Sequence, residues 1–400
     1  SSQRTWVNGF TTLLRPSNFM ANPNLKWETT ITRNIGLDWT LFNGKLNGSF
    51  EFYKNTTKDL LIAFPVSGTG YEFQYRNLGK TQNSGFETTF TWHVVNKKNW
   101  GIDLSGNINF NRNKIIQLGI KDYYNDTHWA SSEIDPEYVV AVGGRVGEIV
   151  GYQNAGRYEV SDFTGYNAST DKWTLKDGVD DATAIIGKLR PGALKLKDQD
   201  GDHKVTASDK VKIGDVTPDC FGGFNINARV YNFDLSSQFN YSIGNQEYNA
   251  NKIEYTTTGK YIYRNMIDVM KEGKRWTNLD PETGLLSNDP DRLAKLNEHT
   301  TMWSPYMSKM VLTDWAIEDA SFLRLNTLTI GYTLPNHLTH RVGINSLRVY
   351  CTGYNLFTIT GYSGFDPEAD TFRKTALTPN VDYSAYPKSR SFVIGLNLNF

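Results

Sequence analysis

The sequence lacks an excess of charge of either sign. Its 400 residues include 42 Lys and Arg and 42 Asp and Glu, so the formal net charge is zero. Nucleic-acid binding depends on clustered basic residues that neutralise phosphates, and no such cluster is present. Long apolar runs are also missing, since no stretch approaches the roughly 18 apolar residues that a transmembrane helix requires. The sequence therefore predicts no nucleic-acid partner and, within these residues, no membrane-spanning helix.

Cysteine and catalytic motifs are scarce as well. Cys220 and Cys351 are far apart in the sequence, and we interpret them as isolated small apolar residues, with pairing across a sheet as the open alternative. The sequence contains no G-x-S-x-G, H-E-x-x-H or C-x-x-C motif. Among the histidines, only His337 and His340 are close together, in a segment that we expect to be a solvated turn. We therefore expect that the protein is not an enzyme.

Aromatic residues and glycine are abundant instead. The sequence contains 22 Tyr, 21 Phe, 10 Trp and 34 Gly, and asparagine is frequent. Aromatic residues favour strands, whereas glycine and asparagine favour turns. The composition therefore predicts an all-β protein with many turns.

Alternation of apolar and polar residues marks the expected strands. Every second residue from Phe392 to Phe400 is apolar, which is typical of a strand whose two faces meet different environments. The dipeptide Asn43-Gly44 predicts a tight hairpin between two such segments, because both positions tolerate positive φ. Nine segments carry the pattern, at residues 34–42, 45–54, 85–95, 100–110, 223–230, 233–243, 321–335, 346–357 and 391–400.

The predicted strands are long. They contain about 10–13 residues, against roughly five or six in ordinary globular proteins, and about 9–11 residues are needed to cross a bilayer. In residues 321–335 the apolar positions change phase, so we expect a β-bulge near Asn326-Thr327.

The connections between these strands alternate in length. The short ones are residues 43–44, 96–99, 231–232 and 335–344, and the long ones are residues 55–82, 113–219, 246–320 and 358–389. Alternate connections of an up-and-down sheet lie at opposite ends, so all long loops share one end. Outer-membrane barrels show this asymmetry, with short periplasmic turns, long extracellular loops, an apolar face toward lipid and a polar lumen. A soluble propeller or sandwich is the alternative, but propeller repeats of about 40–50 residues are absent and such loops are unusual.

The number of strands indicates an incomplete barrel. Single-chain bacterial barrels normally have an even number of strands, and a sheet in lipid must close. The opening residues, SSQRTWVNGF, have neither an initial methionine nor the pattern of a signal peptide. We therefore expect residues 1–400 to form the C-terminal part, about nine strands, of a large antiparallel transmembrane β-barrel, with Phe400 at its periplasmic rim.

Several segments resemble one protein family. The stretches NPNLKWETTITRNIGLDWTLFNGKLNGSFEFYKNTTKDLL, NLGKTQNSGFETTFTW, ASFLRLNTLTIGYTLP and LRVYCTGYNLFTITGYSGFDPEAD are similar, in this order, to the SusC/RagA-like TonB-dependent outer-membrane transporters of Bacteroidetes. The resemblance extends over residues 22–400. It implies a barrel of about 22 strands, together with an N-terminal plug and a TonB-contacting segment that these residues do not include.

The resemblance also implies a function. It leads us to expect TonB-dependent active import of an oligosaccharide or peptide across the bacterial outer membrane, together with a SusD-like surface lipoprotein and with outer-membrane lipid around the wall. The alternatives are a siderophore-type TonB-dependent receptor, a passive outer-membrane porin, and an outer-membrane enzyme or adhesin. Residues 113–219 and 246–320 would be two long extracellular loops.

One short motif has the spacing of a calcium-binding loop. In DQDGDHKVTASD, the first, third, fifth, seventh and twelfth positions offer oxygen ligands. His203 replaces the usual glycine at the sixth position, a strain of about 1–2 kcal/mol. The alternative is an Asp-rich turn capped by its own side chains, and a structural Ca²⁺ would stiffen the loop at 113–219. The candidate ligands are Asp198, Asp200, Asp202, the backbone carbonyl of Lys204, and Asp209.

The long connections are rich in aromatic side chains, which stack on sugars and pack on apolar peptide side chains equally well. We expect most of them to pack within the loops. They include Tyr123, Tyr124, Trp129, Tyr138, Tyr152, Tyr158, Tyr166, Trp173, Tyr255, Tyr261, Tyr263, Trp276, Trp303, Tyr306, Trp315, Tyr362, Tyr383 and Tyr386.

A short helix is predicted at residues 261–276, YIYRNMIDVMKEGKRW. There Ile262, Met266, Val269 and Met270 fall on one helical face. We expect this helix to pack on the rim of the barrel, because it is too short to cross a bilayer.

Overall fold

One long antiparallel sheet dominates the computed structural model, which describes residues 3–7, 10–14, 18–119, 123–125, 134–258, 262–307, 309–371 and 377–400. Its strand order is β23-β21-β20-β17-β16-β7-β6-β5-β4, and the short β3 pairs with β6 in parallel. The nine predicted strands are all present, which confirms the all-β fold. The strands of the sheet are β3 Phe19–Met20, β4 Thr29–Leu41, β5 Leu46–Pro65, β6 Phe73–Asn96, β7 Trp100–Gln117, β16 Cys220–Val230, β17 Phe233–Ile243, β20 Phe322–Thr333, β21 Ser346–Thr360 and β23 Ser391–Asn399.

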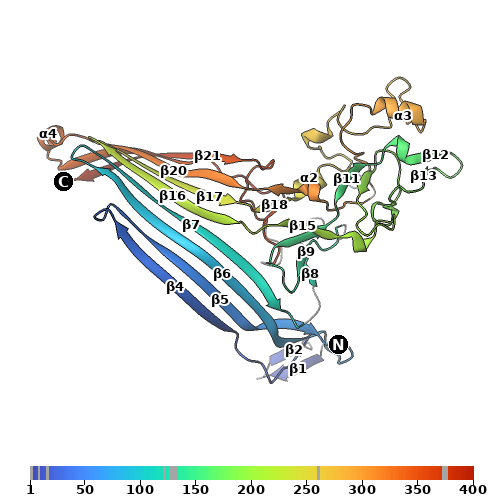
Figure 1. The fold of residues 1–400 in the computed structure, drawn as a ribbon, viewed down its shortest axis with the longest axis horizontal. Coiled ribbons are helices and arrows are strands. Elements are labelled where there is room, and N and C mark those ends of the chain that lie inside the picture. Colours follow the sequence, from blue (N-terminus) through green and yellow to red (C-terminus); the bar gives the residue numbers. More distant parts are fainter. Residues whose placement is uncertain are drawn as a thin grey trace.

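The connections of the sheet gather at two ends. Figure 1 shows the short turns and the C-terminus at one end and the large folded connections at the other. Within the described residues, β4 and β23 are the two edges of the sheet, so the sheet is open. No helix in this part of the chain is long and apolar enough to cross a membrane. The two cysteines are free and lie in β16 and β21, as expected for isolated residues.

The long connection expected at residues 55–82 is wrong. Strands β5 and β6 continue as a paired ribbon as far as Pro65 and Phe73, so only residues 66–72 connect them. The pairing shifts register twice between Lys58 and Leu61, and Asp59 has a φ of 60°. Because each irregularity changes which side chains share a face, the alternation ends in the sequence before the strand ends in space.

The expected bulge in β20 is confirmed. Across β17, Thr327 pairs with Gln238 and Leu325 pairs with Phe239, which leaves Asn326 without a register partner. The pairing with β21 shifts at the same residue. The extra residue keeps the leucines on both sides of the bulge on one face of the sheet.

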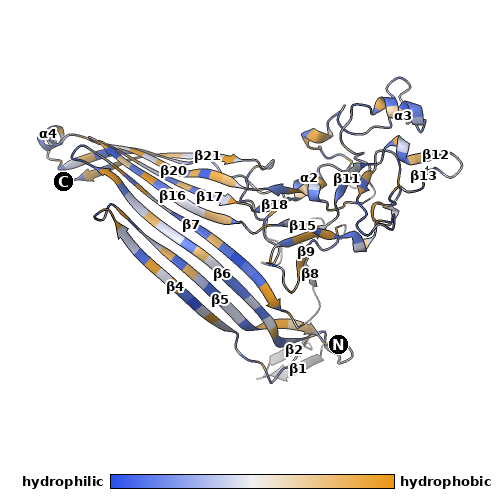
Figure 2. Ribbon diagram, in the orientation of Figure 1, coloured by the Kyte–Doolittle hydropathy of each residue, from blue (hydrophilic) through white to orange (hydrophobic). Residues whose placement is uncertain are grey.

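One face of the sheet is apolar and exposed. Ile35, Ile394 and Phe400 are 77%, 78% and 80% exposed. Along the strands in Figure 2, hydrophobic and hydrophilic residues alternate. Soluble proteins rarely expose an apolar surface this extensive, so this face is suited to contact with an apolar environment.

The long connections fold into a body that we call the loop lobe, consisting of the described parts of residues 118–219, 244–321 and 361–390. Its strands are β8 Tyr123–Asn125, β9 Tyr138–Val140, β10 Glu148–Gly151, β11 Asn154–Arg157, β12 Phe163–Asn167, β13 Lys172–Leu175, β14 Leu194–Leu196, β15 Val211–Asp215, β18 Gln246–Asn249, β19 Ile317–Asp319 and β22 Val381–Asp382. Its helices are α1 Thr183–Ile186, α2 Ala250–Glu254 and α3 Pro290–Leu296, with short 3-10 turns η1 Val160–Asp162, η2 Ala207–Asp209, η3 Asp268–Met270 and η4 Asp314–Ala316. Outside the lobe lie a hairpin of β1 Gln3–Val7 and β2 Phe10–Leu14, and a turn with α4 Asn336–Thr339 and η5 His340–Val342. His337 and His340 in this turn are both exposed.

A hydrophobic core holds the loop lobe together. Tyr158 comes from the 118–219 connection, whereas Trp276 and Leu293 come from the 244–321 connection, and all three are buried in one cluster. Each such side chain contributes about 1.5–3 kcal/mol when buried. The two connections therefore form one packed body.

Most of the described aromatic residues of the connections are buried or partly buried in the lobe, as expected. Tyr263, Tyr306 and Tyr386 are exposed instead. Trp129 and Tyr261 lie outside the described residues, and the side chains of Tyr123 and Tyr124 do too. The buried ones are Tyr138, Tyr152, Tyr158, Trp173, Trp276, Trp303 and Tyr362.

The helix predicted at residues 261–276 is wrong. Within its described residues, 262–276, the segment forms only the 3-10 turn η3. The backbone N–H of Ile267 donates to Tyr255 (3.2 Å) and that of Trp276 donates to Met302 (3.0 Å), so these donors bond to other segments. Met270 is buried in the lobe core, whereas Ile262 is 64% exposed. Tertiary contacts therefore override the helical periodicity.

Candidate functional sites in the loop lobe

The Asp-rich motif forms a tight loop directly after β14. The carboxylate of Asp198 accepts backbone N–H bonds from Asp200 (3.0 Å), Gly201 (2.9 Å) and His203 (2.7 Å). Asp202 in turn accepts from the backbone N–H of Lys204 at 2.7 Å. These bonds curl the chain around the first aspartate, and they also form in an Asp-rich turn that is capped by its own side chains.

Three of the predicted ligands converge in this loop. One oxygen from each of Asp198, Asp200 and Asp202 lies within 4.8 Å of the others. His203, at the position where glycine is usual, has a φ of 61°, in the left-handed region. The strain expected from the sequence is therefore present at that residue.

Asp209, the last predicted ligand, lies beneath the loop. It is fully buried, and its two carboxylate oxygens accept backbone N–H bonds from Gln199 (2.8 Å) and Thr206 (2.7 Å). It also completes the capping box of η2. Asp209 thus braces the loop from inside, and Lys204 continues into a bridge with Asp181.

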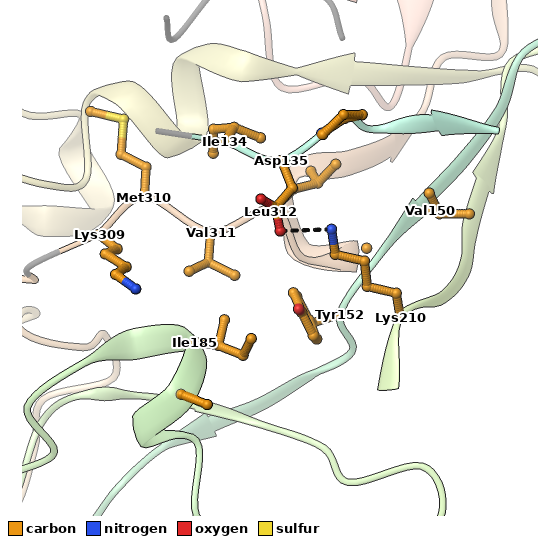
Figure 3. Close-up of a pocket in the computed structure, with 13 residues that line it drawn as sticks. Ile134, Asp135, Val150, Tyr152, Ile185, Lys210, Lys309, Met310, Val311 and Leu312 are labelled. Atoms are coloured by element: carbon orange, nitrogen blue, oxygen red, sulfur yellow. Dashed lines mark hydrogen bonds and ion pairs between the residues drawn. The ribbon is translucent and has the colours of Figure 1, made fainter. Parts of the chain in front are cut away.

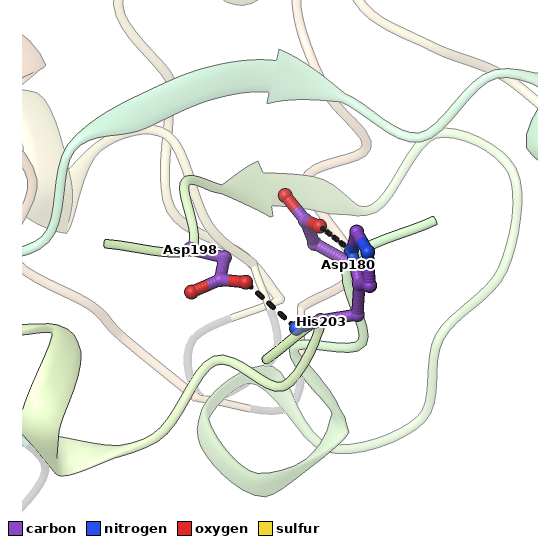
Figure 4. Close-up of side chains that lie close together, drawn as sticks. All are labelled: Asp180, Asp198 and His203. Carbon is purple, nitrogen blue, oxygen red and sulfur yellow. Dashed lines mark hydrogen bonds and ion pairs between the residues drawn. The ribbon is translucent and has the colours of Figure 1, made fainter. Parts of the chain in front are cut away.

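Asp180 is a fourth acidic group that sequence spacing missed. The ring Nδ1 of His203 lies 3.0 Å from the Asp180 carboxylate (Figure 4). One oxygen each of Asp180 and Asp198 and a ring nitrogen of His203 lie close enough together to hold one metal ion. Asp180 is 18 residues before the motif, so only the fold brings it there. It adds a hard oxygen donor beside the loop.

The charges of the loop favour a bound cation. Bonds from the backbone N–H groups, led by that of Gly201, hold the pKa of Asp198 below its usual value. For Asp200, the N–H of Asp202 lowers the pKa, but partial burial and the neighbouring carboxylates together raise it above its usual value. A hydrogen bond to Asp180 raises the pKa of His203. Oxygen donors of this kind fit Ca²⁺, which would neutralise the mutual repulsion.

A second site is a cavity of about 510 Å³ between the two main connections of the lobe (Figure 3). An ion pair of 2.8 Å between Lys210 and Asp135 lies on one side. Tyr152 is 3% exposed, and its hydroxyl has no hydrogen-bond partner within the described residues. Burial, with the charges of Asp135 and Asp209, raises the pKa of Tyr152 to about 12. The apolar lining comes from Ile134, Val150, Ile185, Met310, Val311 and Leu312.

This cavity combines an apolar wall with a few polar groups. Such lining is common in small-molecule sites, because apolar contacts supply affinity and polar groups fix orientation. The neutral Tyr152 hydroxyl can donate a hydrogen bond, and Lys210 carries a positive charge that Asp135 already balances. The cavity therefore suits an apolar side chain with a nearby hydrogen-bond acceptor.

A polar groove of about 610 Å³ lies where the sheet meets the loop lobe. Asn240 donates to Glu368 at 3.3 Å, while its own side-chain oxygen has no partner within the described residues. Amide side chains both donate and accept hydrogen bonds, so the groove can bind sugar hydroxyls or peptide groups. Its polar and aromatic lining includes Asn107, Asn109, Phe221, Asn240, Tyr241, Ser242, Asn245, Phe322, Glu368 and Asn380.

Comparisons with known proteins agree with this architecture. The family model "TonB dependent receptor-like, beta-barrel" matches residues 4–184. "TonB-dependent receptor P3" of Formosa agariphila is 28% identical over 389 residues, which cover 95% of this chain and 35% of the relative. "TonB-dependent receptor SusC" of Bacteroides thetaiotaomicron is 28% identical over 394 residues, which cover 96% of this chain and 33% of the relative. This chain is therefore similar, over nearly its whole length, to SusC/RagA-like TonB-dependent receptors.

A solved structure also matches the whole chain. The structure described as the RagAB peptide transporter has a TM-score of 0.70 at 25% identity, over 100% of this chain and 38% of that chain. This chain spans roughly a third of the length of the curated relatives that it matches. TonB-dependent receptor barrels are outer-membrane proteins, and the nine-stranded sheet is similar to part of the wall of such a barrel.

Proposed function

We propose that the whole receptor imports an oligosaccharide or a peptide across the bacterial outer membrane, by TonB-dependent active transport. The main support is the joint likeness, over nearly all of this chain, to the receptor SusC and to the RagAB peptide transporter. In this proposal the nine strands form part of the barrel wall, and the loop lobe receives the substrate. The protein catalyses no reaction.

The proposed orientation places the loop lobe outside the cell and the short turns in the periplasm. Outer-membrane barrels have short periplasmic turns and longer extracellular loops. All the large connections of this sheet lie at one end, opposite the C-terminus (Figure 1). The exposed apolar face would then contact outer-membrane lipid.

We further propose two protein partners. A SusD-like surface lipoprotein would cover the extracellular end, as the SusC/RagA resemblance implies. TonB would act through receptor segments outside these residues. The polar groove near Asn240 would lie on the route of the substrate, because it is at the junction of wall and lobe.

Uptake measurements on cells that make the whole receptor test the proposal. Labelled oligosaccharide and peptide mixtures are offered to cells with and without TonB, and depletion from the medium is analysed by mass spectrometry. TonB-dependent depletion of one class supports active import. Uptake that persists without TonB would identify the passive porin, and uptake of ferric chelates alone would identify the siderophore receptor.

A matched pair of variants tests the polar groove. Asn240→Ala removes an amide that lines it, whereas Asn227→Ala removes an amide of β16 that does not. We expect roughly fivefold slower uptake for the first variant, since a lost substrate hydrogen bond costs about 1 kcal/mol. Equal uptake by both variants, with equal amounts of receptor at the cell surface, would show that the substrate does not contact the groove.

We also propose that the Asp198 loop binds a structural Ca²⁺. Its support is the convergence of three carboxylates with Asp180 beside them. Asp198→Asn in the whole receptor should lower calcium affinity, measured by titration after removal of metal with a chelator. Unchanged affinity would leave an Asp-rich turn capped by its own side chains.

A further inference from the structure

Glu247 of β18 is buried without a partner. Its side chain is 0% exposed, and within the described residues neither carboxylate oxygen has a hydrogen bond. A buried ionised carboxylate without compensation is strongly unfavourable, and a neutral one without partners still loses its hydrogen bonds to water. The two carboxylate oxygens therefore require a bound group that compensates for the lost contact with water.

Strand register places other oxygen donors on the same face. Glu247 lies opposite Glu318 of β19, and Asn249 lies opposite Asp382 of β22. Residues that pair directly, and residues two apart on one strand, share a face. All four side chains therefore lie on one face of the three-stranded sheet, and the Asn249 and Asp382 side chains are each 3% exposed.

The hydrogen bonds around this face satisfy some of these groups. Glu318 accepts from the side chains of Asn249 (2.9 Å) and Ser363 (2.8 Å) and pairs with Lys252 (3.5 Å). The Asn249 side-chain oxygen, by contrast, has no partner within the described part of the chain. Two oxygens of Glu247 and one of Asn249 are thus left for a ligand.

Tyr362 orients the remaining carboxylate. Its hydroxyl donates to one oxygen of Asp382 at 2.8 Å, which leaves the other oxygen of Asp382 available. Both residues are buried. The atoms on this face that remain available to coordinate a cation are then all oxygens, from two carboxylates and one amide.

The nearby basic side chains are already ion-paired with other acidic residues. Arg324 pairs with Asp366 (2.6 Å) and Glu368 (3.1 Å), and Lys252 pairs with Glu318. Burial, together with the charges of Asp382, Asp370 and Asp366, raises the pKa of Glu247 to about 10. Among the described residues, no basic side chain is paired with Glu247.

We propose that Glu247, Asp382 and the side-chain oxygen of Asn249 bind a divalent cation, Ca²⁺, inside the loop lobe. Ca²⁺ is favoured because it takes carboxylate and amide oxygens in flexible geometry, whereas softer metals select nitrogen or sulfur. The ion connects β18, which directly follows the wall strand β17, to β22 of the last connection. It is separate from the Asp198 loop and does not depend on the proposed import function.

Calcium titration of the whole receptor in detergent, after treatment with a chelator, tests this site. Glu247→Gln should lose one Ca²⁺ per chain and the thermal stabilisation that calcium gives. The control Asp198→Asn alters the other candidate loop and should keep the ion at Glu247. Asn249→Asp adds a carboxylate and should bind calcium roughly tenfold more tightly, because affinity rises with ligand charge.

Two results would overturn the proposal. One is a folded Glu247→Gln receptor that binds as many Ca²⁺ ions as the native receptor. The other is an infrared carbonyl band of a protonated carboxyl group that is absent from Glu247→Gln and persists in the native receptor at saturating calcium. If Glu247→Gln does not fold, unchanged calcium affinity of Asn249→Asp overturns the proposal instead.

Discussion

Tyr350 of β21 lies across Gly395 of β23, and its ring covers the position where a side chain would begin. The two residues pair directly in the antiparallel ladder, and a Cβ atom at residue 395 would lie 2.4 Å from the ring. Glycine thus leaves room for the aromatic ring of the neighbouring strand. The same direct pairing joins Trp39 with Gly48, Tyr53 with Gly85, and Tyr241 with Gly222.

Gly395→Val should therefore weaken the packing of the last strand. We expect a loss of about 1–3 kcal/mol, since the ring must leave its position to admit the new side chain. The measurement is the temperature at which the whole receptor loses its folded mobility in gel electrophoresis. Gly36→Val is the control, because a Cβ there meets its nearest atom at 3.6 Å; equal losses for both variants would contradict the role of Tyr350.

Gly192→Ala should destabilise the loop lobe and spare the barrel wall. Gly192 has a φ of 85°, and a Cβ there would lie 2.3 Å from the indole of Trp276. Strain and overpacking together cost about 2–4 kcal/mol. Tryptophan fluorescence should report unfolding of the lobe at lower temperature, while the gel mobility of the barrel is unchanged.

Gly156→Ala is the matched control for this variant. Gly156 also has a left-handed φ, of 90°, but no atom lies within 4 Å of its Cβ position. It should show only the backbone cost of about 1 kcal/mol. If both variants lower the lobe transition equally, the contact with Trp276 does not matter.

Asp366→Asn should destabilise the junction between lobe and wall at neutral pH. Arg324 is 3% exposed and pairs with Asp366 at 2.6 Å, so loss of the carboxylate leaves a buried charge that Glu368 only partly balances. Breaking a buried ion pair costs about 3–5 kcal/mol. Thermal unfolding of the whole receptor measures the difference.

The same ion pair predicts a pH dependence. Burial raises the pKa of Asp366, but hydrogen bonds from Arg324 and from the backbone of Glu368 lower it below its usual value. A lowered pKa in the folded state stabilises the fold above the ordinary aspartate pKa of about 3.9, and this stability is lost as the pH falls further. The gap in unfolding temperature between the native receptor and Asp366→Asn should therefore shrink below about pH 4. A gap that is constant down to about pH 2 would contradict this.

His203→Gly should tighten calcium binding in the Asp198 loop. The left-handed φ of 61° is strained for histidine and not for glycine, a difference of about 1 kcal/mol. We expect roughly fivefold tighter binding, less whatever the lost contact with Asp180 contributes. His203→Asn is the comparison, since asparagine also tolerates this region, and weaker binding by both variants would show that the ring itself supports the loop.

The strands of the wall could be predicted from the sequence alone. Their alternation is a property of neighbouring residues, because side chains of a strand point to opposite faces in turn. The regular run from Phe392 to Phe400 was enough to predict a strand, and the phase change at Asn326 was enough to predict a bulge. The structure confirms both. The convergence of Asp198, Asp200 and Asp202 was also local, since they are separated by single residues.

The loop lobe could be predicted only in part. The ribbon at residues 55–82 was missed because irregularities around Asp59 break the alternation, and the helix at 261–276 was overruled by contacts with other segments. Nothing in the sequence QEYN indicates that Glu247 is buried, because its surroundings come from β19 and β22, which lie some 70 and 135 residues further along the chain. Local periodicity thus determined the strands of the long sheet. Tertiary structure decided which polar groups of the loop lobe are removed from water, because burial depends on segments that meet only after folding.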